Sequence, residues 1–149
     1  MITVQTEDFD HFKEYQQLKN NADGDGAIVT FTGLVRDFND DGCVSAIYLE
    51  HYPGMTEKSL MTICSKARKK WDLGQIRVIH RIGRIGVNEQ IVFVGVTSKH
   101  RLAAFESTQF IMDYLKTQAP LWKQENSGKG AIWVAAKESD KQATDKWDK

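Results

Sequence analysis

Cysteine is scarce in this sequence, and the residues present form no recognisable motif. The two cysteines, Cys43 and Cys64, lie far apart and match neither a metal-binding nor a redox spacing. A disulfide scaffold is therefore excluded, and a chain without disulfides is typical of the cytosol. The N-terminus has no basic region followed by an apolar stretch, the pattern that indicates a signal peptide. We expect a cytoplasmic protein.

An excess of charge of one sign is also lacking. The 20 basic and 20 acidic side chains cancel, so no overall field attracts nucleic acid or an anionic membrane. No apolar run approaches the roughly 20 residues needed to cross a bilayer. With 149 residues, the chain is long enough for one domain with a proper core. Any site for an anion must therefore be local.

The common catalytic motifs are missing as well. There is no Walker A loop, and the segment Gly24–Gly26 lacks the third glycine of a dinucleotide-binding fingerprint. The four histidines are scattered without a metal-binding spacing. No GxSxG motif is present, and neither cysteine has an obvious histidine partner. We therefore expect no metal site.

The strongest structural signal begins at Ile91. The run Ile91–Val96 is apolar or glycine without alternation, which indicates a strand buried on both faces. Ser98 is suited to cap a helix that continues to about Gln118, because Pro120 cannot extend it. The residues expected to form the apolar side of this helix are Leu102, Ala104, Phe105, Ile111, Met112 and Leu115.

The charges at the start of this helix do not follow from packing. Lys99, His100 and Arg101 are expected in its first turn, where the helix dipole is already positive. The conflict amounts to a few tenths to about 1 kcal/mol at an exposed site. Two interpretations stay open. One is a solvated basic turn, and the other is an anion pocket in which free N–H groups and cations converge on a phosphate.

Further cations favour the pocket. Lys116 lies near the C-terminal end of the same helix, Lys123 follows soon after it, and Arg36 ends another predicted strand. Together with His100 and Arg101, these side chains suit a compact, phosphorylated ligand. Crowded cations also lower one another's pKa, which suits a lysine for a role as nucleophile or acid/base catalyst.

Strand and helix signals are interspersed along the rest of the chain. The predicted strands are 2–5, 27–36, 44–52, 75–82 and 131–136, and the other predicted helices are about 8–21 and a segment capped by Thr56. We expect residues 37–42 to form an exposed loop, Gly83 and Gly86 to mark a link, and 138–149 to form a weakly held tail. Hairpin-like connections argue against a wholly parallel sheet. We predict one α+β domain over residues 1–149 with a mixed or antiparallel sheet.

Several longer blocks of sequence carry a resemblance. They are Phe31–Gly33 leading to Val35-Arg36, Leu49–Glu57, Val78–Gly83, Val92–Val96, Phe110–Lys116, and Pro120 with Trp122-Lys123. These blocks resemble the large, catalytic subunit family of molybdopterin synthase. The blocks occur in the same order as in that family, from about Gly26 to Trp147. Several blocks of this length make the similarity highly specific.

The resemblance implies a fold, a reaction and partners. The fold expected is an α/β-hammerhead-like domain. The reaction expected is a sulfur transfer that converts cyclic pyranopterin monophosphate (precursor Z) into molybdopterin, in molybdenum cofactor biosynthesis. Sulfur arrives as a thiocarboxylate on the C-terminal Gly-Gly tail of a small ubiquitin-like subunit. Two large subunits form a homodimer within a heterotetramer, and neither a metal nor another cofactor takes part.

The resemblance also assigns a substrate site to particular residues. These are Arg36, His100, Arg101, Lys116 and Lys123, with the backbone around Leu34-Val35 and Gln124-Glu125. The cations are those already isolated by their charge. Leu34 departs from the family pattern, in which a basic residue is common at this position. Lys116 is implied as the main catalytic group, as acid/base or as acyl acceptor, and Lys123 as a stabiliser of negative charge.

Two other classes of function make different demands on the sequence. An adaptor that only docks a ubiquitin-like protein needs an apolar surface but no converging cations. A nucleic-acid-binding module needs a broad basic face, which a net charge of zero does not favour.

Overall fold

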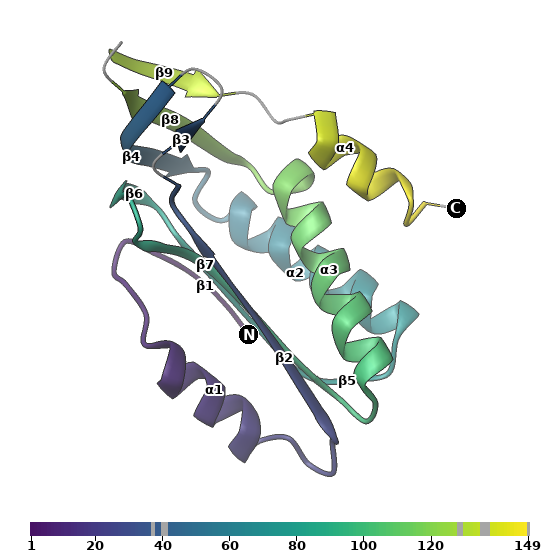
Figure 1. The fold of residues 1–149 in the computed structure, drawn as a ribbon. Coiled ribbons are helices and arrows are strands. Elements are labelled where there is room, and N and C mark those ends of the chain that lie inside the picture. The colour runs from purple at the N-terminus through teal and green to yellow at the C-terminus, as the bar shows by residue number, and fades with distance from the viewer. Residues whose placement is uncertain (37, 40–41, 128–129, 135–137, 149) are drawn as a thin grey trace.

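Two β-sheets and their covering helices form the molecule (Figure 1). The computed structural model describes residues 1–36, 38–39, 42–127, 130–134 and 138–148. The first sheet has four strands, in the spatial order β1 (Ile2–Gln5), β5 (Leu73–Arg81), β7 (Gln90–Ser98) and β2 (Ala27–Leu34). The strands of the second sheet are β3 (Phe38–Asn39), β4 (Gly42–His51), β6 (Gly83–Gly86), β8 (Leu121–Ser127) and β9 (Gly130–Val134). The helices are α1 (His11–Asn20), α2 (Met55–Lys70), α3 (Arg101–Gln118) and α4 (Glu138–Asp145).

The first sheet is mixed and has helices on both faces. β1 runs parallel to β5, whereas β5 and β2 both run antiparallel to β7. In Figure 1, α1 lies on one side of this sheet and α2 and α3 lie on the other. Both faces of β7 are therefore covered, which explains its apolar run without alternation. The prediction of an α+β domain with a mixed sheet is confirmed.

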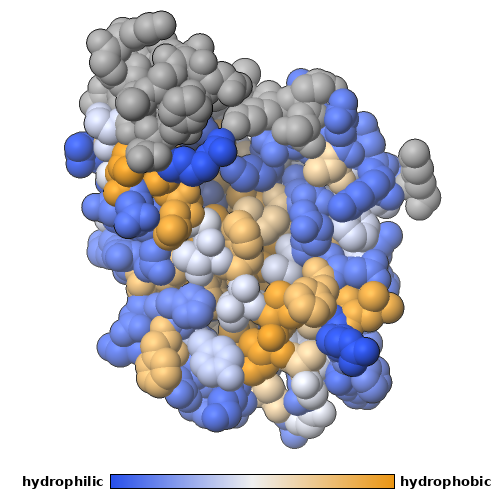
Figure 2. Space-filling model, in the orientation of Figure 1, coloured by the Kyte–Doolittle hydropathy of each residue, from blue (hydrophilic) through white to orange (hydrophobic). Residues whose placement is uncertain are grey.

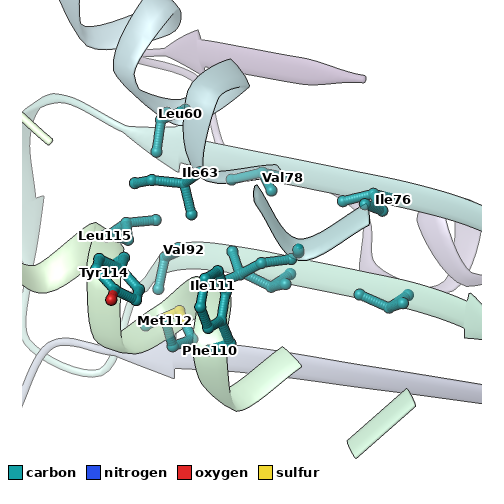
Figure 3. Close-up of a cluster of buried hydrophobic side chains, with 13 residues drawn as sticks. Leu60, Ile63, Ile76, Val78, Val92, Phe110, Ile111, Met112, Tyr114 and Leu115 are labelled. Carbon is teal, nitrogen blue, oxygen red and sulfur yellow. The ribbon is translucent and has the colours of Figure 1, made fainter. Parts of the chain in front are cut away.

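The main core lies between this sheet and helices α2 and α3. Figure 3 shows these side chains pointing toward one another from both layers. Ile63 of α2 and Ile111 of α3 are almost completely buried, and each contributes about 1.5–3 kcal/mol of hydrophobic stabilisation. The alternation in β5 divides its side chains, so that Val78 faces these helices and Ile79 packs on the α1 side.

The second sheet packs around a smaller cluster formed by Val35, Ile47, Leu49 and Ile85. β4 pairs antiparallel with β8 along most of its length and with β6 on its other edge. The segment with Gly83 and Gly86, predicted as a link, is thus a strand. Within the predicted loop 37–42, Phe38–Asn39 form the short strand β3 and Gly42 begins β4, with which β3 pairs.

Both predicted helix caps are wrong. The Ser98 hydroxyl donates to the carbonyl of Asp72, and α3 begins later, with His100 as its N-cap residue. Only Arg101 of the basic run therefore belongs to the helix. The Thr56 side chain lies inside α2, where its Oγ1 accepts from the backbone of Tyr52.

The C-terminal helix α4 is linked to the core through the residues that follow it. The indole of Trp147 contacts Trp71 and Phe110 edge-on, and its Nε1 donates to the buried carboxylate of Asp113 at 2.7 Å. Tyr114 donates to Asp148 at 2.6 Å. Across the ranges that the structure describes, no helix combines the length and apolar character needed to cross a membrane.

Candidate functional site

Three of the predicted site residues lie at the C-terminal end of α3 and the neighbouring end of the second sheet. Lys116 is exposed in the last turn of the helix. Lys123 is half-buried in β8, where it pairs with the buried Leu49 of β4. Leu49 packs in the same cluster as Val35, which immediately precedes Arg36. We call Arg36, Lys116 and Lys123 the lysine half-site.

Arg36 is placed by the residue before it. Val35 is buried, its amide donates to Glu89 O at 3.0 Å, and its carbonyl accepts from Asn88 N at 2.8 Å. These two backbone bonds fix the end of β2, so that the exposed guanidinium of Arg36 starts from a rigid position. Val35 is thus an anchor for the site, and its side chain is not available to a ligand.

The remaining residues predicted around these cations differ in what they can present. The register of β2 shifts between Gly33 and Leu34, and Leu34 is exposed. Gln124 follows Lys123 in β8, so its side chain points to the opposite face of the sheet. For Glu125 the backbone alone is described, paired with strands on both sides.

A buried histidine that the sequence did not single out lies beneath this half-site. His80 of β5 is 5% exposed, and its Nδ1 lies 2.8 Å from the carbonyl of Arg81. Burial lowers the pKa of His80 to about 4, and the positive charge of Lys116 adds to the effect. The ring is therefore neutral near pH 7, with Nδ1 as donor and Nε2 as acceptor. Its position on the helix-facing side of β5 could have been recognised from the alternation of that strand.

His100 and Arg101 lie at the other end of α3. Both side chains are exposed, and we call them the helix-start half-site. At about 1.5 Å per residue, the axial distance from Arg101 to Lys116 is about 22 Å. The expectation that all these cations converge in one pocket is therefore wrong for a single copy of the chain, because a straight helix keeps its two ends apart.

The charge conflict expected at the start of α3 is present in the structure. Its first turn contains no acidic residue, and the His100 side chain makes no capping hydrogen bond. Lys99 instead lies 3.8 Å from the carboxylate of Asp72, and both side chains are largely exposed. Within the described residues, the first turn of α3 thus offers Arg101 no acidic partner. A ligand anion at this position would satisfy both the helix N-terminus and the guanidinium.

The architecture and the charges define a class of protein: an α+β domain with two cationic half-sites suited to an anionic ligand. Among the described side chains, no group of three or more His, Cys, Asp or Glu residues is arranged to hold a metal ion. The chain belongs to the MoaE protein family, whose model matches residues 4–118.

Curated relatives and solved structures agree with this family. The chain is 55% identical over 146 residues to the molybdopterin synthase catalytic subunit of Escherichia coli (strain K12), covering 98% of this chain and 97% of that protein. The Vibrio cholerae protein of the same name is 50% identical, covering 99% and 97%. The structure of a molybdopterin biosynthesis MoaE protein from Burkholderia ambifaria matches with a TM-score of 0.86 at 42% identity, covering 100% of this chain and 98% of that one. The structure of molybdopterin synthase from Staphylococcus aureus matches with a TM-score of 0.80 at 27% identity, covering 89% and 95%. The predicted family is confirmed.

Proposed function

We infer that this chain is the catalytic subunit of a molybdopterin synthase, a sulfurtransferase of molybdenum cofactor biosynthesis. The observation that carries this inference is the 55% identity to the Escherichia coli catalytic subunit over 98% of the chain. The two cationic half-sites also support this inference, since the substrate expected for this family is a phosphorylated pterin and therefore an anion.

The reaction that we propose is the conversion of precursor Z into molybdopterin. A small ubiquitin-like subunit delivers the sulfur as a thiocarboxylate on its C-terminal Gly-Gly tail. The large subunit binds the substrate and directs the transfer, with no metal or other cofactor. We propose that the reaction takes place in the cytoplasm.

The site that we propose draws on both copies of a homodimer. Within one copy, about 22 Å of helix separates Arg101 from Lys116, which exceeds the reach of a compact ligand. A second copy can supply its helix-start half-site to the lysine half-site of the first. The cations then converge as the residue pattern predicted, but across the dimer and not within one chain.

The residues in this composite site have different tasks. Arg36, together with His100 and Arg101 of the second copy, binds the phosphate and the pterin. Lys116 acts either as an acid/base catalyst that moves a proton or as a transient acceptor of the acyl group from the thiocarboxylate. Lys123 stabilises the negative charge that develops on the acyl or phosphate oxygens. The half-buried position of Lys123 supports this task, because a partly desolvated cation acts on nearby charge more strongly. The backbone around Leu34-Val35 and that of Gln124-Glu125 complete the walls of the site.

The test is a reconstituted reaction that contains the purified chain, precursor Z and a thiocarboxylated small subunit, with molybdopterin as the product measured. We expect product with the wild-type chain and with Lys13→Ala, which removes an exposed lysine of α1, on the other side of the first sheet from α3. We expect a nearly complete loss of product with Lys116→Ala. Binding of the small subunit without product, in the wild-type chain, would indicate an adaptor and refute the enzyme.

A further inference from the structure

The hydroxyl of Thr56 joins two segments of the chain that are 64 residues apart. Its Oγ1 accepts from the amide of Tyr52 at 3.0 Å and donates to the carbonyl of Pro120 at 2.9 Å. We call these two bonds the Thr56 bridge. The Thr56 side chain is completely buried, at 0% exposure. Buried backbone groups need such partners, so the bridge is costly to remove.

The bridge extends the pairing of β4 with β8 by one step. The ladder between these strands ends at His51 and Leu121, so its register sets Tyr52 opposite Pro120. Proline has no amide hydrogen and cannot complete a regular ladder pair. The Thr56 hydroxyl instead connects these two facing residues.

The segment held by the bridge separates the two lysines of the lysine half-site. α3 ends at Gln118 and β8 begins at Leu121, with Pro120 in the bend between them. Lys116 precedes this bend and Lys123 follows it. The geometry of the bend therefore sets how the two lysines are placed relative to each other.

The bend lies beneath a polar part of the surface. Figure 2 shows mainly hydrophilic side chains around the C-terminal end of α3. Lys116 is exposed there, and Lys123 is half-buried. A lysine side chain is long and flexible, so the position of its backbone decides what its amine can reach. A bridge that fixes the bend from its buried side thus also constrains both amines.

The other end of the bridge is anchored in the core. Thr56 lies in the first turn of α2, and Leu60 of the next turn is 1% exposed in the main core. The amide of Thr56 donates to the carbonyl of Tyr52 at 2.9 Å, which closes the turn before the helix. The carboxylate of Glu57 accepts from the amide of Gly54 in the same turn. The hydroxyl therefore holds the bend from a rigid position.

We propose that Thr56 is a positioning residue for catalysis, because its hydroxyl fixes the Pro120 carbonyl and thereby the relative placement of Lys116 and Lys123. Thr56 is buried, so it acts through the two lysines and not on the substrate. The proposal rests on the proposed function, in which both lysines serve the same sulfur transfer. The phosphate and the pterin are assigned to residues outside the bend. Loss of the bridge should therefore affect turnover more than substrate binding.

The kinetic test compares two substitutions of Thr56 in the reconstituted reaction. Thr56→Val keeps the size of the side chain but removes its hydroxyl, whereas Thr56→Ser keeps the hydroxyl. For Thr56→Val we expect kcat per folded molecule to fall roughly ten- to a hundredfold and KM for precursor Z to stay within about twofold, because small misplacements of catalytic groups slow the reaction by such factors. Thr56→Ser should retain most of the wild-type kcat. Wild-type kcat in Thr56→Val, or an equal loss in Thr56→Ser, would overturn the proposal.

Thr108→Val is the matched control. Thr108 is 5% exposed, and its hydroxyl donates to the carbonyl of Ala104 at 2.7 Å within α3. This substitution also removes a hydrogen bond of a buried hydroxyl, but one that connects no second element. Its kcat should equal that of the wild-type chain. A loss as large as that of Thr56→Val would show that general destabilisation is responsible and would overturn the proposal.

Hydrogen exchange tests the bridge itself, without substrate or small subunit. The amides of residues 119–123 should exchange faster in Thr56→Val than in the wild-type chain, and at the wild-type rate in Thr108→Val. Unchanged exchange in Thr56→Val would show that other contacts hold the bend, and the proposal would be wrong.

A variant of the bend keeps the proposal testable if Thr56→Val does not fold. Pro120→Gly frees the backbone of the bend and leaves the buried hydroxyl in place. It should also lower kcat at an unchanged KM, and wild-type kcat would overturn the proposal. A wild-type chain that forms no product would refute the proposed function instead, and the exchange measurement would still test the bridge.

Discussion

Replacing Arg101 with glutamine tests the electrostatic argument for the composite site. Arg101 is the first residue of α3 and is exposed, and no acidic residue in the first turn compensates for it. A charge-assisted contact to phosphate contributes about 1.5–3 kcal/mol, so the variant should bind precursor Z roughly ten- to a hundredfold more weakly. Docking of the small subunit should be unchanged, since Arg101 is assigned to the substrate alone.

The same substitution should have little effect on stability. Removal of a cation from the positive end of an exposed helix gains about 0.3–1 kcal/mol at most. For a chain of this size, about 1 kcal/mol corresponds to a change in Tm of about 2–4 °C. We therefore expect the Tm of Arg101→Gln to stay constant or to rise slightly.

The assay consists of titrations of precursor Z and of the small subunit, with a melting curve on the same preparation. Lys99→Gln is the matched control, because Lys99 adjoins the helix-start half-site but lies beside Asp72. It should retain nearly full affinity for precursor Z. If Arg101→Gln bound precursor Z normally, or melted at a much lower temperature, the basic turn would be structural and the anion-site hypothesis would be wrong.

Three further predictions concern catalysis, sulfur chemistry and pH. Lys116→Ala should lose nearly all turnover at unchanged Tm, because its side chain is exposed at a helix end. The double variant Cys43→Ser, Cys64→Ala should retain sulfur transfer, because burial raises the pKa of Cys64 to about 11 and leaves it an inert thiol. A folded but inactive double variant would instead favour a persulfide on this chain. His80 has a pKa of about 4 in the folded state against about 6.5 in the unfolded state, so the unfolded state binds more protons between these pH values. The free energy of unfolding should therefore fall by about 3 kcal/mol as the pH drops from 6.5 to 4. Denaturant unfolding at pH 7 and 4.5 should show a smaller difference for His80→Asn, and an equal difference would contradict this role.

Helices and strands could be predicted from the sequence where a local pattern of residues has a single structural explanation. The buried strand at Ile91–Val96 follows from sheet faces that are both covered. The predicted cap at Ser98 failed because its hydroxyl bonds to Asp72, a contact between distant segments that no local pattern reveals. β6 was missed because a short strand between two glycines resembles a link.

For the candidate site, too, some features could be predicted from the sequence and others could not. Charge and the family resemblance identified the cations, and their roles stay predictions. The sequence also contained the signal that one chain cannot bring them together, because helix length alone separates Arg101 from Lys116. The exposure of Leu102 and Phe105 could not be predicted, since helical periodicity alone does not distinguish an apolar side chain buried in the core from one exposed at the surface.

The most direct test of the composite catalytic site is complementation between two inactive partners. Chains with Arg101→Gln and chains with Lys116→Ala are co-expressed with different affinity tags, and the mixed dimer is purified. Its turnover is then measured at a precursor Z concentration below the Kd of the Arg101→Gln variant. One of its two sites combines an intact Lys116 with an intact Arg101 from the other chain, so we predict about half of the wild-type turnover per dimer. A mixed dimer as inactive as both parents would place each site within a single chain and contradict the account.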